Sequence, residues 1–503
     1  MRYIVNSREM KLYDNNTTEK YHVPSIVLME RAAVAFVEAL REQNLNLSDV
    51  LIVCGNGNNG GDGYAVARLL QLAGSRVTVA AADAKHLQNA SKATEANLLQ
   101  KKIWQAYGND ILTEIPTDKE YTAVIDAVFG VGLSRNIEGD YASLIAQMND
   151  VKGVKIALDI ASGISADNGS VLGIAFRADI TITFAFEKLG MILWPGNEYS
   201  GKVILKDIGI DEHSFGERRP GVVALEECDF ADLPERKGHS NKGTYGKLLV
   251  VAGSVGMSGA AYLSAKAAYC TGCGLVRLFT PEENRAVLQA QLPEAIMTTY
   301  SSKKLDVASL VEAINWANVI VCGPGIGTTD VAEQLVKTVL KNASVPVLLD
   351  ADALNLIAKD CNVLLRPHTE LVVTPHLGEM SRLSGDSVGY IQNHLIEVAE
   401  EFARQYNVVC VLKDEHTVTS VPYSQTYLNL SGNPGMATAG CGDVLSGVIG
   451  SLMAQGMQAK EAASLGVYLH GRAGDVMAEQ TGTRGMMASD ILEGIRRVTR
   501  EIA

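Results

Sequence analysis

The sequence has little cysteine, a deficit of basic residues and no long apolar run, and each shortage excludes a class of protein. Eight cysteines in 503 residues are too few for a disulfide framework. The 44 Lys and Arg residues against 57 Asp and Glu residues give a net charge of −13, which disfavours nonspecific binding to nucleic acid or anionic membranes. Apolar runs such as 248–252 cannot span a bilayer, and residues 1–14 lack a signal-peptide core. We therefore expect a cytoplasmic protein with no nucleic-acid and no membrane partner.

What the sequence does have is the material for packed α/β cores. Hydrophobic residues make up 47% of the chain and charged residues only 20%, which excludes a disordered scaffold. Short β-rich runs alternate with glycine-rich turns and helical patterns, as in βαβ units on parallel sheets. One series of strands is expected at 50–54, 76–82, 123–129, 155–160 and 179–184, and a second at 247–254, 317–323, 345–350, 370–375 and 408–413.

The two series are separated by a stretch without periodicity. Residues 211–243 are polar and contain prolines and glycines, so we interpret them as a linker and the entry to a second domain. The sequence therefore predicts two α/β domains, at 1–215 and 225–503, and a helical end from about Asp443.

The first glycine loop, at 55–63, follows a predicted strand and opens a predicted helix. It satisfies the G-x-G-x-x-G pattern, and Asp83 follows its last glycine by 23 residues, as in dinucleotide-binding folds. A turn that simply requires glycine is the alternative. Asn58, Asn59 and Asp62 crowd the place of a pyrophosphate, and their oxygens suit a hard cation or a hydroxylated ligand better.

Two further loops, at 126–136 and 158–169, follow the ends of predicted parallel strands. Asp126 and Asp159 begin these loops and should face the same sheet edge as Asn59, because open α/β sheets bind ligands at the carboxyl ends of their strands. Helix capping or a turn would explain either aspartate alone. The convergence of three such strand ends favours a site.

These loops, with residues 23–33, resemble the NAD(P)H-hydrate epimerase domain of bifunctional YjeF-type nucleotide repair enzymes. The resemblance implies a Rossmann-like domain in which Asn59, Asp126 and Ser162 ligate potassium and Asp159 is the catalytic acid/base. The residues that it implies for binding the hydrated nicotinamide nucleotide are Asn58, Asn59, Gly60, Gly61, Asp62, Gly130, Val131, Gly132, Leu133, Ser134, Arg135, Asn136 and Asp159.

The most informative stretch of the second half is 431–456. Gly440 and Gly442 flank Cys441 just before Asp443, and an apolar helix follows. Backbone amides at such a helix start can hold a phosphoryl group, and an adjacent carboxylate can accept a proton from an attacking hydroxyl. The alternative is an ordinary helix start with an aspartate in its first turn.

This constellation resembles the ribokinase-like superfamily and, within it, the ADP/ATP-dependent NAD(P)H-hydrate dehydratases. Other stretches that resemble this family are 242–261, 322–327, 348–355 and 374–380. The resemblance implies a ribokinase-like fold in which Asp443 is the catalytic base and ADP binds with Mg²⁺. It implies hydrate binding by Ala260, Gly325, His376 and Asp443, and ADP or AMP binding by Lys413, Asp414, Glu415, His416, Thr417 and Gly442.

Three other patterns leave alternatives open. Residues 196–203 nearly match a phosphate-binding P-loop but lack its final hydroxyl, so a hairpin is the preferred interpretation. Cys270 and Cys273 could form a redox pair, although two thiols near a helix end is the simpler view. Asp350 and Asp352 could cap the next helix or contact a nucleotide-bound magnesium ion, and the sequence favours neither.

The sequence as a whole predicts a bifunctional enzyme. It would epimerise the R and S hydrates of NADH and NADPH and would dehydrate the S epimer with ADP, giving AMP and phosphate. We also expect a homo-oligomer. The alternative is an ATP-dependent kinase of a vitamin precursor fused to a non-catalytic Rossmann-like binding domain.

Overall fold

The computed structural model describes residues 1–81, 93–116, 119–365 and 369–502. Asp83 of the dinucleotide pattern lies outside these residues. The chain divides into two compact units, one of Tyr3–Gly221 and the other of Met1–Arg2 with Val222–Ala503. None of the helices in the described ranges combines the length and the apolar character needed to cross a membrane.

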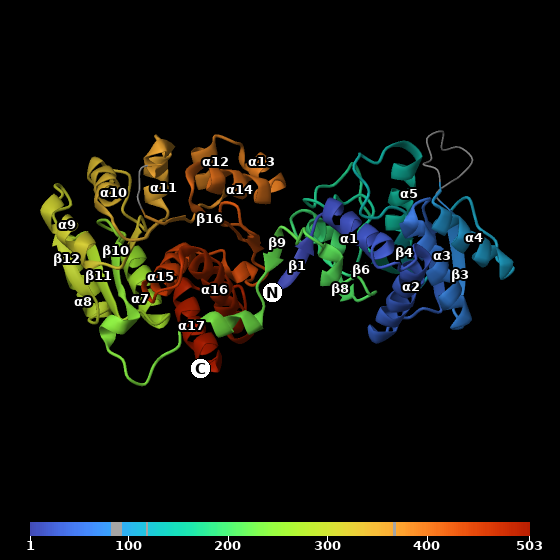
Figure 1. The fold of residues 1–503 in the computed structure, drawn as a ribbon, viewed down its shortest axis with the longest axis horizontal. Helices are drawn as coiled ribbons and strands as arrows, with labels where there is room; N and C mark the ends of the chain where they lie inside the picture. The colour runs from blue at the N-terminus through green and yellow to red at the C-terminus, as the bar shows by residue number, and fades with distance from the viewer. Residues whose placement is uncertain (82–92, 117–118, 366–368, 503) are drawn as a thin grey trace. The chain divides into compact units, whose positions relative to one another are not determined.

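The first unit is built on a parallel sheet with the strand order β3-β2-β4-β5-β6-β8 (Figure 1). Its strands are β2 (Asp49–Cys54), β3 (Arg76–Ala81), β4 (Ala123–Ala127), β5 (Val154–Leu158), β6 (Ile180–Phe184) and β8 (Lys202–Lys206). Every residue of β2 and β4 is buried, as expected for strands covered on both faces. Because β3 and β4 lie on opposite sides of β2, the strand order reverses there, and such a switch point opens a crevice at the carboxyl ends.

The helices of the first unit place the loops around this crevice. They are α1 (Ser7–Glu19), α2 (Ser25–Glu42), α3 (Asn58–Leu72), α4 (Glu95–Ala106), α5 (Gly139–Asp150) and α6 (Gly196–Ser200). The N-terminus of α1 is fixed by a reciprocal capping box between Asn6 and Glu9. Helix α3 begins at Asn58, within the glycine-rich stretch 55–63, and packs on β2, with α2 and α4 beside it. A short parallel pair, β1 (Arg2–Val5) and β7 (Glu187–Lys188), completes the unit.

The hairpin predicted at 196–203 is wrong. The residues before it form a 3-10 turn, Leu189–Met191, rather than a strand, and Gly196–Ser200 form α6. Strand β8 pairs in parallel with β6 instead of forming a hairpin with the preceding run. The apolar run before α6 resembles a strand in sequence because a buried turn has the same composition.

The second unit contains a larger sheet with the order β12-β11-β10-β13-β14-β15-β16-β17-β18-β9. It is parallel from β12 to β16, and β17 is antiparallel to both of its neighbours. The strands are β9 (Val222–Ala224), β10 (Lys247–Val251), β11 (Leu275–Pro281), β12 (Ile296–Tyr300), β13 (Val319–Cys322), β14 (Val347–Leu349), β15 (Leu371–Val373), β16 (Val409–Leu412), β17 (Val418–Ser420) and β18 (Thr426–Leu428).

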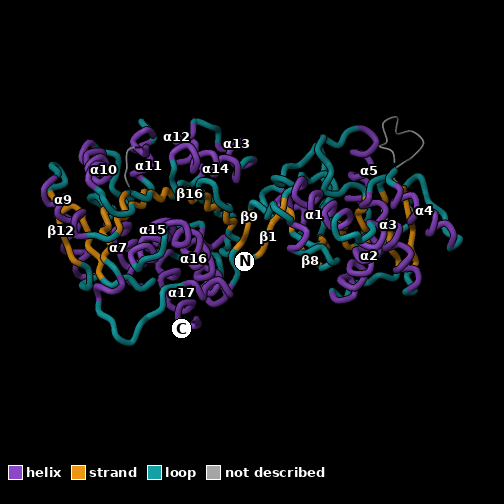
Figure 2. Tube along the Cα trace, in the orientation of Figure 1, coloured by secondary structure: helices purple, strands orange, loops and turns teal. Residues whose placement is uncertain are grey.

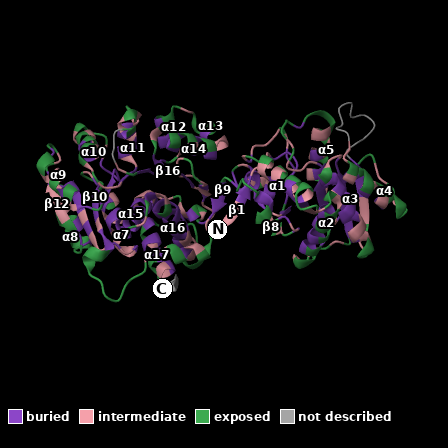
Figure 3. Ribbon diagram, in the orientation of Figure 1, coloured by how far each residue is buried: buried purple, intermediate pink, exposed green. Residues whose placement is uncertain are grey.

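Helices cover both faces of this sheet (Figures 1 and 2). One layer contains α7 (Ser258–Cys270), α15 (Cys441–Ala454), α16 (Ala459–Thr481) and α17 (Ala488–Ile502). The other contains α9 (Val307–Trp316), α10 (Asp330–Asn342), α11 (Asp352–Ile357), α12 (Leu377–Ser384), α13 (Val388–Asn393) and α14 (Leu395–Tyr406), and α8 (Arg285–Gln291) lies beside β12. Buried residues follow the sheet and the inner helix faces (Figure 3), and α15 is almost wholly buried.

Candidate active sites

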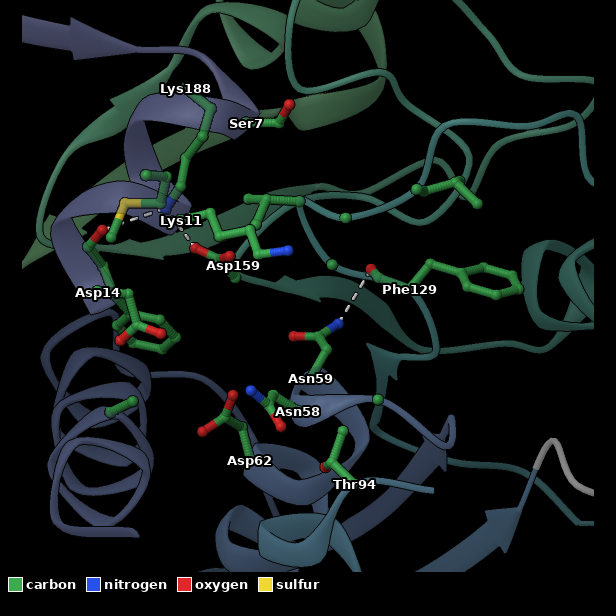
Figure 4. Close-up of a pocket in the computed structure, with 18 of the residues that line it drawn as sticks. Ser7, Lys11, Asp14, Asn58, Asn59, Asp62, Thr94, Phe129, Asp159 and Lys188 are labelled. Carbon is green, nitrogen blue, oxygen red and sulfur yellow. Dashed lines mark hydrogen bonds and ion pairs between the residues drawn. The ribbon is translucent and has the colours of Figure 1, made fainter. Parts of the chain in front are cut away.

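The first unit contains a cavity of about 990 Å³ at the carboxyl ends of its central strands (Figure 4). The glycine loop and the start of α3 form one wall, the loop after β4 a second, and α1 a third. Lys11 and Asp159 point into the same space as Asn58, Asn59 and Asp62 (Figure 4). The switch-point crevice expected from the topology is therefore present and lined by polar groups.

An oxygen-rich cluster lies beside this cavity, where β2, β4 and β5 end. Asp126 is fully buried, and its carboxylate accepts hydrogen bonds from the Ser162 amide and hydroxyl, both at 2.7 Å. The Ser162 Oγ in turn accepts from the Phe129 amide at 2.8 Å. Asn59 donates through Nδ2 to the Phe129 carbonyl at 3.0 Å (Figure 4). The structure thus brings together Asn59, Asp126 and Ser162, the three residues that the family resemblance implies as potassium ligands.

This cluster fits a hard cation. Burial raises the pKa of Asp126 to about 6 despite its hydrogen bonds, so its negative charge lacks a compensating positive one. The Oδ1 atom of Asn59 is buried and makes no hydrogen bond. A buried carboxylate beside an unpartnered amide oxygen and a hydroxyl is a donor set suited to a hard ion, and a bound cation would satisfy both groups.

Asp159 is held by a lysine that the sequence analysis missed. The Lys188 ammonium is 1% exposed and contacts Asp159 Oδ1 at 2.5 Å, Thr183 Oγ1 at 2.8 Å and the Phe184 carbonyl at 3.1 Å. Three acceptors match the three N–H groups of an ammonium. Thr183 also donates to Asp159 Oδ1, at 3.0 Å, so both donors use one oxygen and leave Oδ2 to a ligand.

Two more carboxyl groups face Asp159 across the cavity. Burial, together with the charges of Asp159 and Asp14, raises the pKa of Asp62 well above its ordinary value. Burial and the charge of Asp159 also raise the pKa of Asp14, on α1. Perturbed carboxyl groups that line a cavity are typical of a functional site. The sequence analysis missed Asp14, because the sequence of helix α1 alone does not indicate which loops the helix packs against.

The cavity gathers most of the residues predicted to bind the hydrated nucleotide. Those that line it are Asn58, Asn59, Asp62, Gly130, Val131, Gly132, Leu133, Ser134, Arg135 and Asp159. Gly60 and Gly61 are buried behind this surface, and Asn136 is exposed outside the lining. Gly60 is required by packing, since a Cβ there would lie 1.8 Å from the Gly55 carbonyl oxygen.

In the second unit, polar residues gather where the parallel strands end, around the start of α15. Gly440 takes φ 93°, a left-handed conformation that suits glycine, and ends the loop before Cys441. The first amides of α15 have no acceptor within the helix and can bind an anion. Asp443 lies in this first turn. The structure therefore places Asp443 in the same helix turn as backbone amides that can bind an anion.

The acidity of Asp443 is shifted toward neutral. Burial and the charge of Asp350 raise the pKa of Asp443 to about 7, although Lys413 opposes the shift. Lys413 pairs with Asp350 at 2.8 Å, and a Cβ on Gly442 would lie 3.5 Å from the Lys413 Nζ. A carboxyl group with a pKa near the working pH is well suited to act as a general base.

The other predicted dehydratase residues lie at neighbouring strand ends. Gly325 lies after β13 against Ala260 of α7, since its Cβ would come within 2.8 Å of the Ala260 Cβ. His376 caps α12, where its Nδ1 accepts from the Gly378 amide at 2.9 Å. Burial and the charge of Lys413 lower the pKa of His376, which keeps it neutral. The capping contacts account for His376 without a ligand.

The segment after β16 is the predicted ADP-binding segment. Lys413 donates its backbone amide to the Pro375 carbonyl at 2.8 Å, and His376 and Lys413 form a parallel bridge. His416 contacts the Asn429 carbonyl at 3.1 Å, and burial raises the pKa of Asp414. Glu415 is exposed, and Thr417 is half-buried. Of this segment, Lys413 is the residue that approaches Gly442.

Cys270 and Cys273 do not have the character of a redox pair. Cys270 is the last residue of α7, and Cys273 is buried just beyond it. Burial raises the pKa of Cys270 and raises that of Cys273 to about 11, which holds both as unreactive thiols.

Comparisons with known proteins cover both units. A family model described as YjeF-related protein N-terminus matches residues 25–190, and one described as NAD(P)H-hydrate dehydratase matches residues 248–497. A bifunctional NAD(P)H-hydrate repair enzyme of Moorella thermoacetica is 38% identical over 99% of this chain and 97% of its own length. One from Escherichia coli is 34% identical over 94% of this chain and 89% of its own.

A solved structure supports the fold of the second unit. A ribokinase-like superfamily protein from Enterococcus faecalis is 26% identical, with a TM-score of 0.52, over 56% of this chain and 97% of its own. The fold and the two sites thus define a two-domain α/β enzyme with a Rossmann-like and a ribokinase-like unit. The full-length matches are decisive beyond that: the chain belongs to the family of bifunctional NAD(P)H-hydrate repair enzymes. The predicted family, fold class and enzyme class are confirmed.

Proposed function

We propose that this chain interconverts the R and S hydrates of NADH and NADPH in its first unit. In its second unit it would dehydrate the S hydrate at the expense of ADP. The observation that carries the proposal is the similarity to bifunctional NAD(P)H-hydrate repair enzymes over 99% of the chain. The two clusters of polar residues at the carboxyl ends of both sheets support two separate chemistries.

In the first unit, Asp159 is the proposed catalytic acid/base. Its Oδ1 is held by Lys188 and Thr183, so Oδ2 is the atom that donates a proton to the ring hydroxyl as the ring nitrogen lone pair expels it as water, and that takes a proton back as water adds to the opposite face of the ring. Asn59, Asp126 and Ser162 would hold potassium, which supplies fixed positive charge beside the substrate. The lining loops at 58–62 and 130–136 would bind the nucleotide.

In the second unit, Asp443 is the proposed base for phosphoryl transfer. As Asp443 takes the hydroxyl proton, the hydroxyl oxygen attacks the β-phosphorus of ADP, the bridging P–O bond breaks and AMP leaves. The ring nitrogen then donates its lone pair as the C–O bond breaks, phosphate departs, and loss of a proton from the adjacent carbon restores the double bond. Phosphate is the better leaving group than hydroxide, and this difference drives the reaction.

The binding roles in the second unit are proposed to follow the family. Ala260, Gly325 and His376 would contact the hydrate, and residues 413–417 with Gly442 would contact ADP. Magnesium would arrive on the nucleotide phosphates, since the described part of the chain contains no group of three or more acidic, histidine or cysteine ligands for it. We further propose a cytoplasmic location, which is favoured by the low cysteine content, and a homo-oligomeric state.

The test follows reduced-nicotinamide absorbance after mixing R and S hydrates with ADP, Mg²⁺ and K⁺. Complete recovery is expected, because epimerisation feeds the R form to the dehydratase. Recovery that stops at the S fraction would contradict an active first unit. A stable phosphorylated product from ATP, without recovered NADH, would instead indicate a vitamin-precursor kinase.

An Asp443→Asn variant separates the two activities. It should recover no NADH while still exchanging the R and S hydrates, because its first unit is unchanged. A variant that still recovers NADH at the normal rate would remove Asp443 from the reaction.

A further inference from the structure

The Asp350 carboxylate is a buried group that neither proposed chemistry uses. It is 1% exposed, yet its pKa is lowered, because the charge of Lys413 and three hydrogen bonds together outweigh burial, which acts to raise it. Its Oδ1 accepts from Thr374 Oγ1 at 2.7 Å and from Lys413 Nζ at 2.8 Å, and its Oδ2 accepts from Ser446 Oγ at 2.6 Å. With both oxygens engaged and no exposed surface, Asp350 is not a contact for nucleotide-bound magnesium.

These three donors belong to three different elements. Thr374 follows β15, Lys413 follows β16, and Ser446 lies in α15. The Ser446 hydroxyl also lies 3.0 Å from the Gly442 carbonyl, one turn earlier in the same helix. Asp350, which follows β14, therefore links the first turns of α15 to the carboxyl ends of the central strands. Asp443 is part of the first of these turns.

Asp350 also contributes to the charge around Asp443. The groups that face Asp443 are Asp350 after β14, Asp352 at the start of α11 and Lys413 after β16. Lys413 is faced in addition by Glu379 of α12. From α16, His470 lies near Lys413 and Cys441, and its burial lowers its pKa to about 4, so it stays neutral. The charges that act on the pKa of Asp443 thus come mainly from Asp350 and Lys413.

We propose that Asp350 is a positioning residue of the phosphoryl-transfer site. Its carboxylate holds α15 in place and supplies the negative charge that pairs with Lys413 and opposes ionisation of Asp443. The inference rests on the proposed role of Asp443 as the base. It gives the Asp350–Asp352 motif a function that is neither a helix cap nor a metal contact.

The first test is the pH profile of kcat for ADP-dependent recovery of NADH from the S hydrate. Wild-type activity should fall below about pH 7, as Asp443 becomes protonated. In Asp350→Asn, the loss of a like charge lowers the pKa of Asp443, so this acidic limb should move down by about one pH unit. The plateau should also fall by about 10- to 100-fold, since the start of α15 is less well held.

Further variants separate charge from position. Ser446→Ala keeps the Asp350 charge, so its plateau should fall while its acidic limb stays in place. Lys413→Met, assayed at saturating ADP, should move the limb upward. Asp350→Asn with Lys413→Met removes both charges and should return the limb close to wild type. Glu401→Gln, an equivalent change on the exposed face of α14, should change neither quantity.

The outcomes distinguish the inference from the proposed function. A wild-type chain that recovers no NADH at any pH would contradict the proposed function itself. If the wild type is active and folded Asp350→Asn shows its acidic limb at the same pH as the wild type, the inference is overturned while the proposed function stands. If the single variant does not fold, the double variant avoids an unpaired buried charge. The inference would then be overturned if the acidic limb of the double variant lies at the same pH as that of Lys413→Met. It would also be overturned if Ser446→Ala has the kcat of the wild type.

Discussion

At the scale of single residues, both units place a lysine ammonium against an aspartate close to the proposed chemistry. Lys188 contacts Asp159 directly, whereas Lys413 contacts Asp350, which in turn faces Asp443. In the first unit the lysine fixes the reacting carboxylate, and in the second it offsets the charge of a neighbouring one. A lysine–aspartate pair therefore orients the proposed catalytic carboxylate in the first unit, whereas a second such pair influences the pKa of the proposed catalytic carboxylate in the second unit.

We predict that Lys188→Met lowers the rate of R-to-S exchange by about 100-fold or more, because Asp159 loses the donor that orients it. The rate is measured by chromatographic separation of the epimers after mixing one pure epimer with the variant. Recovery of NADH from pure S hydrate should be unchanged, since the second unit is intact.

The matched control is Lys152→Met, which removes a lysine from an exposed pair with Glu120. It should leave epimer exchange within about twofold of wild type, because an exposed ion pair contributes little. Equal loss in both variants would show that a general charge effect, not the Asp159 contact, is responsible.

The sequence predicted the acidic residues at strand ends better than their partners. Asp126 could be found because it lies in a β-rich run close to a glycine loop, and Asp443 because it directly follows Gly442. The role of Lys188 could not be found from the sequence, because Lys188 contacts Asp159 only once it packs against the end of β6. A lysine in a mostly apolar run is still a weak signal of a buried ion pair. Asp350 was found, but its three donors come from separate elements that no local pattern connects.

At the scale of elements, the glycine pattern at the start of α3 contains one glycine that close packing requires and one that it does not. A Cβ on Gly60 would meet the Gly55 carbonyl oxygen at 1.8 Å and the Asn97 amide at 2.8 Å, whereas a Cβ on Gly57 would meet no atom within 4 Å. Both glycines belong to the same sequence pattern. The lack of a Cβ at Gly60 is therefore what allows the first turn of α3 to lie against the Gly55 carbonyl and Asn97 of α4.

We predict that Gly60→Ala destabilises the first unit by about 3 kcal/mol or more, because the backbone oxygen cannot move away. Gly57→Ala, the matched control, should cost less than about 1 kcal/mol, the usual penalty at a helix N-cap. Urea unfolding followed by the fluorescence of buried Trp104 measures both. Similar stability of the two variants would contradict the close approach of Gly60 to the Gly55 carbonyl.

The central parallel strands of both units were predicted, whereas five strands of the second unit, β9, β11, β12, β17 and β18, were not. Strands such as β2 and β4 are β-rich runs followed by glycine, a pattern that few other elements produce. The segment at 196–203 differs from its prediction because its neighbour forms a buried turn. The neighbour's burial depends on contacts such as Gly190 against Ser165, which lie far apart in the sequence.

At the scale of the whole molecule, the chain combines two units with separate cores and separate proposed ligands. Each unit has its own cluster of buried apolar residues. Potassium is expected to bind only in the first unit and ADP only in the second. Ligand binding should therefore stabilise the two units independently.

We predict two thermal transitions in calorimetry of the full chain. K⁺ should raise one midpoint and ADP the other, each by the equivalent of about 2.7 kcal/mol at a hundredfold excess over its Kd. Asp126→Asn should remove the response to K⁺ and keep the response to ADP, and Na⁺ at equal ionic strength is the control for salt. A single midpoint that both ligands move would contradict the assignment.

The near-neutral ionisation of Asp443 has a physiological consequence. Because burial and the charge of Asp350 raise the pKa of Asp443 to about 7, acidification below neutral pH should reduce the fraction of molecules whose Asp443 can accept a proton. Restoration of damaged coenzyme should then slow under acid stress and recover once the stress ends.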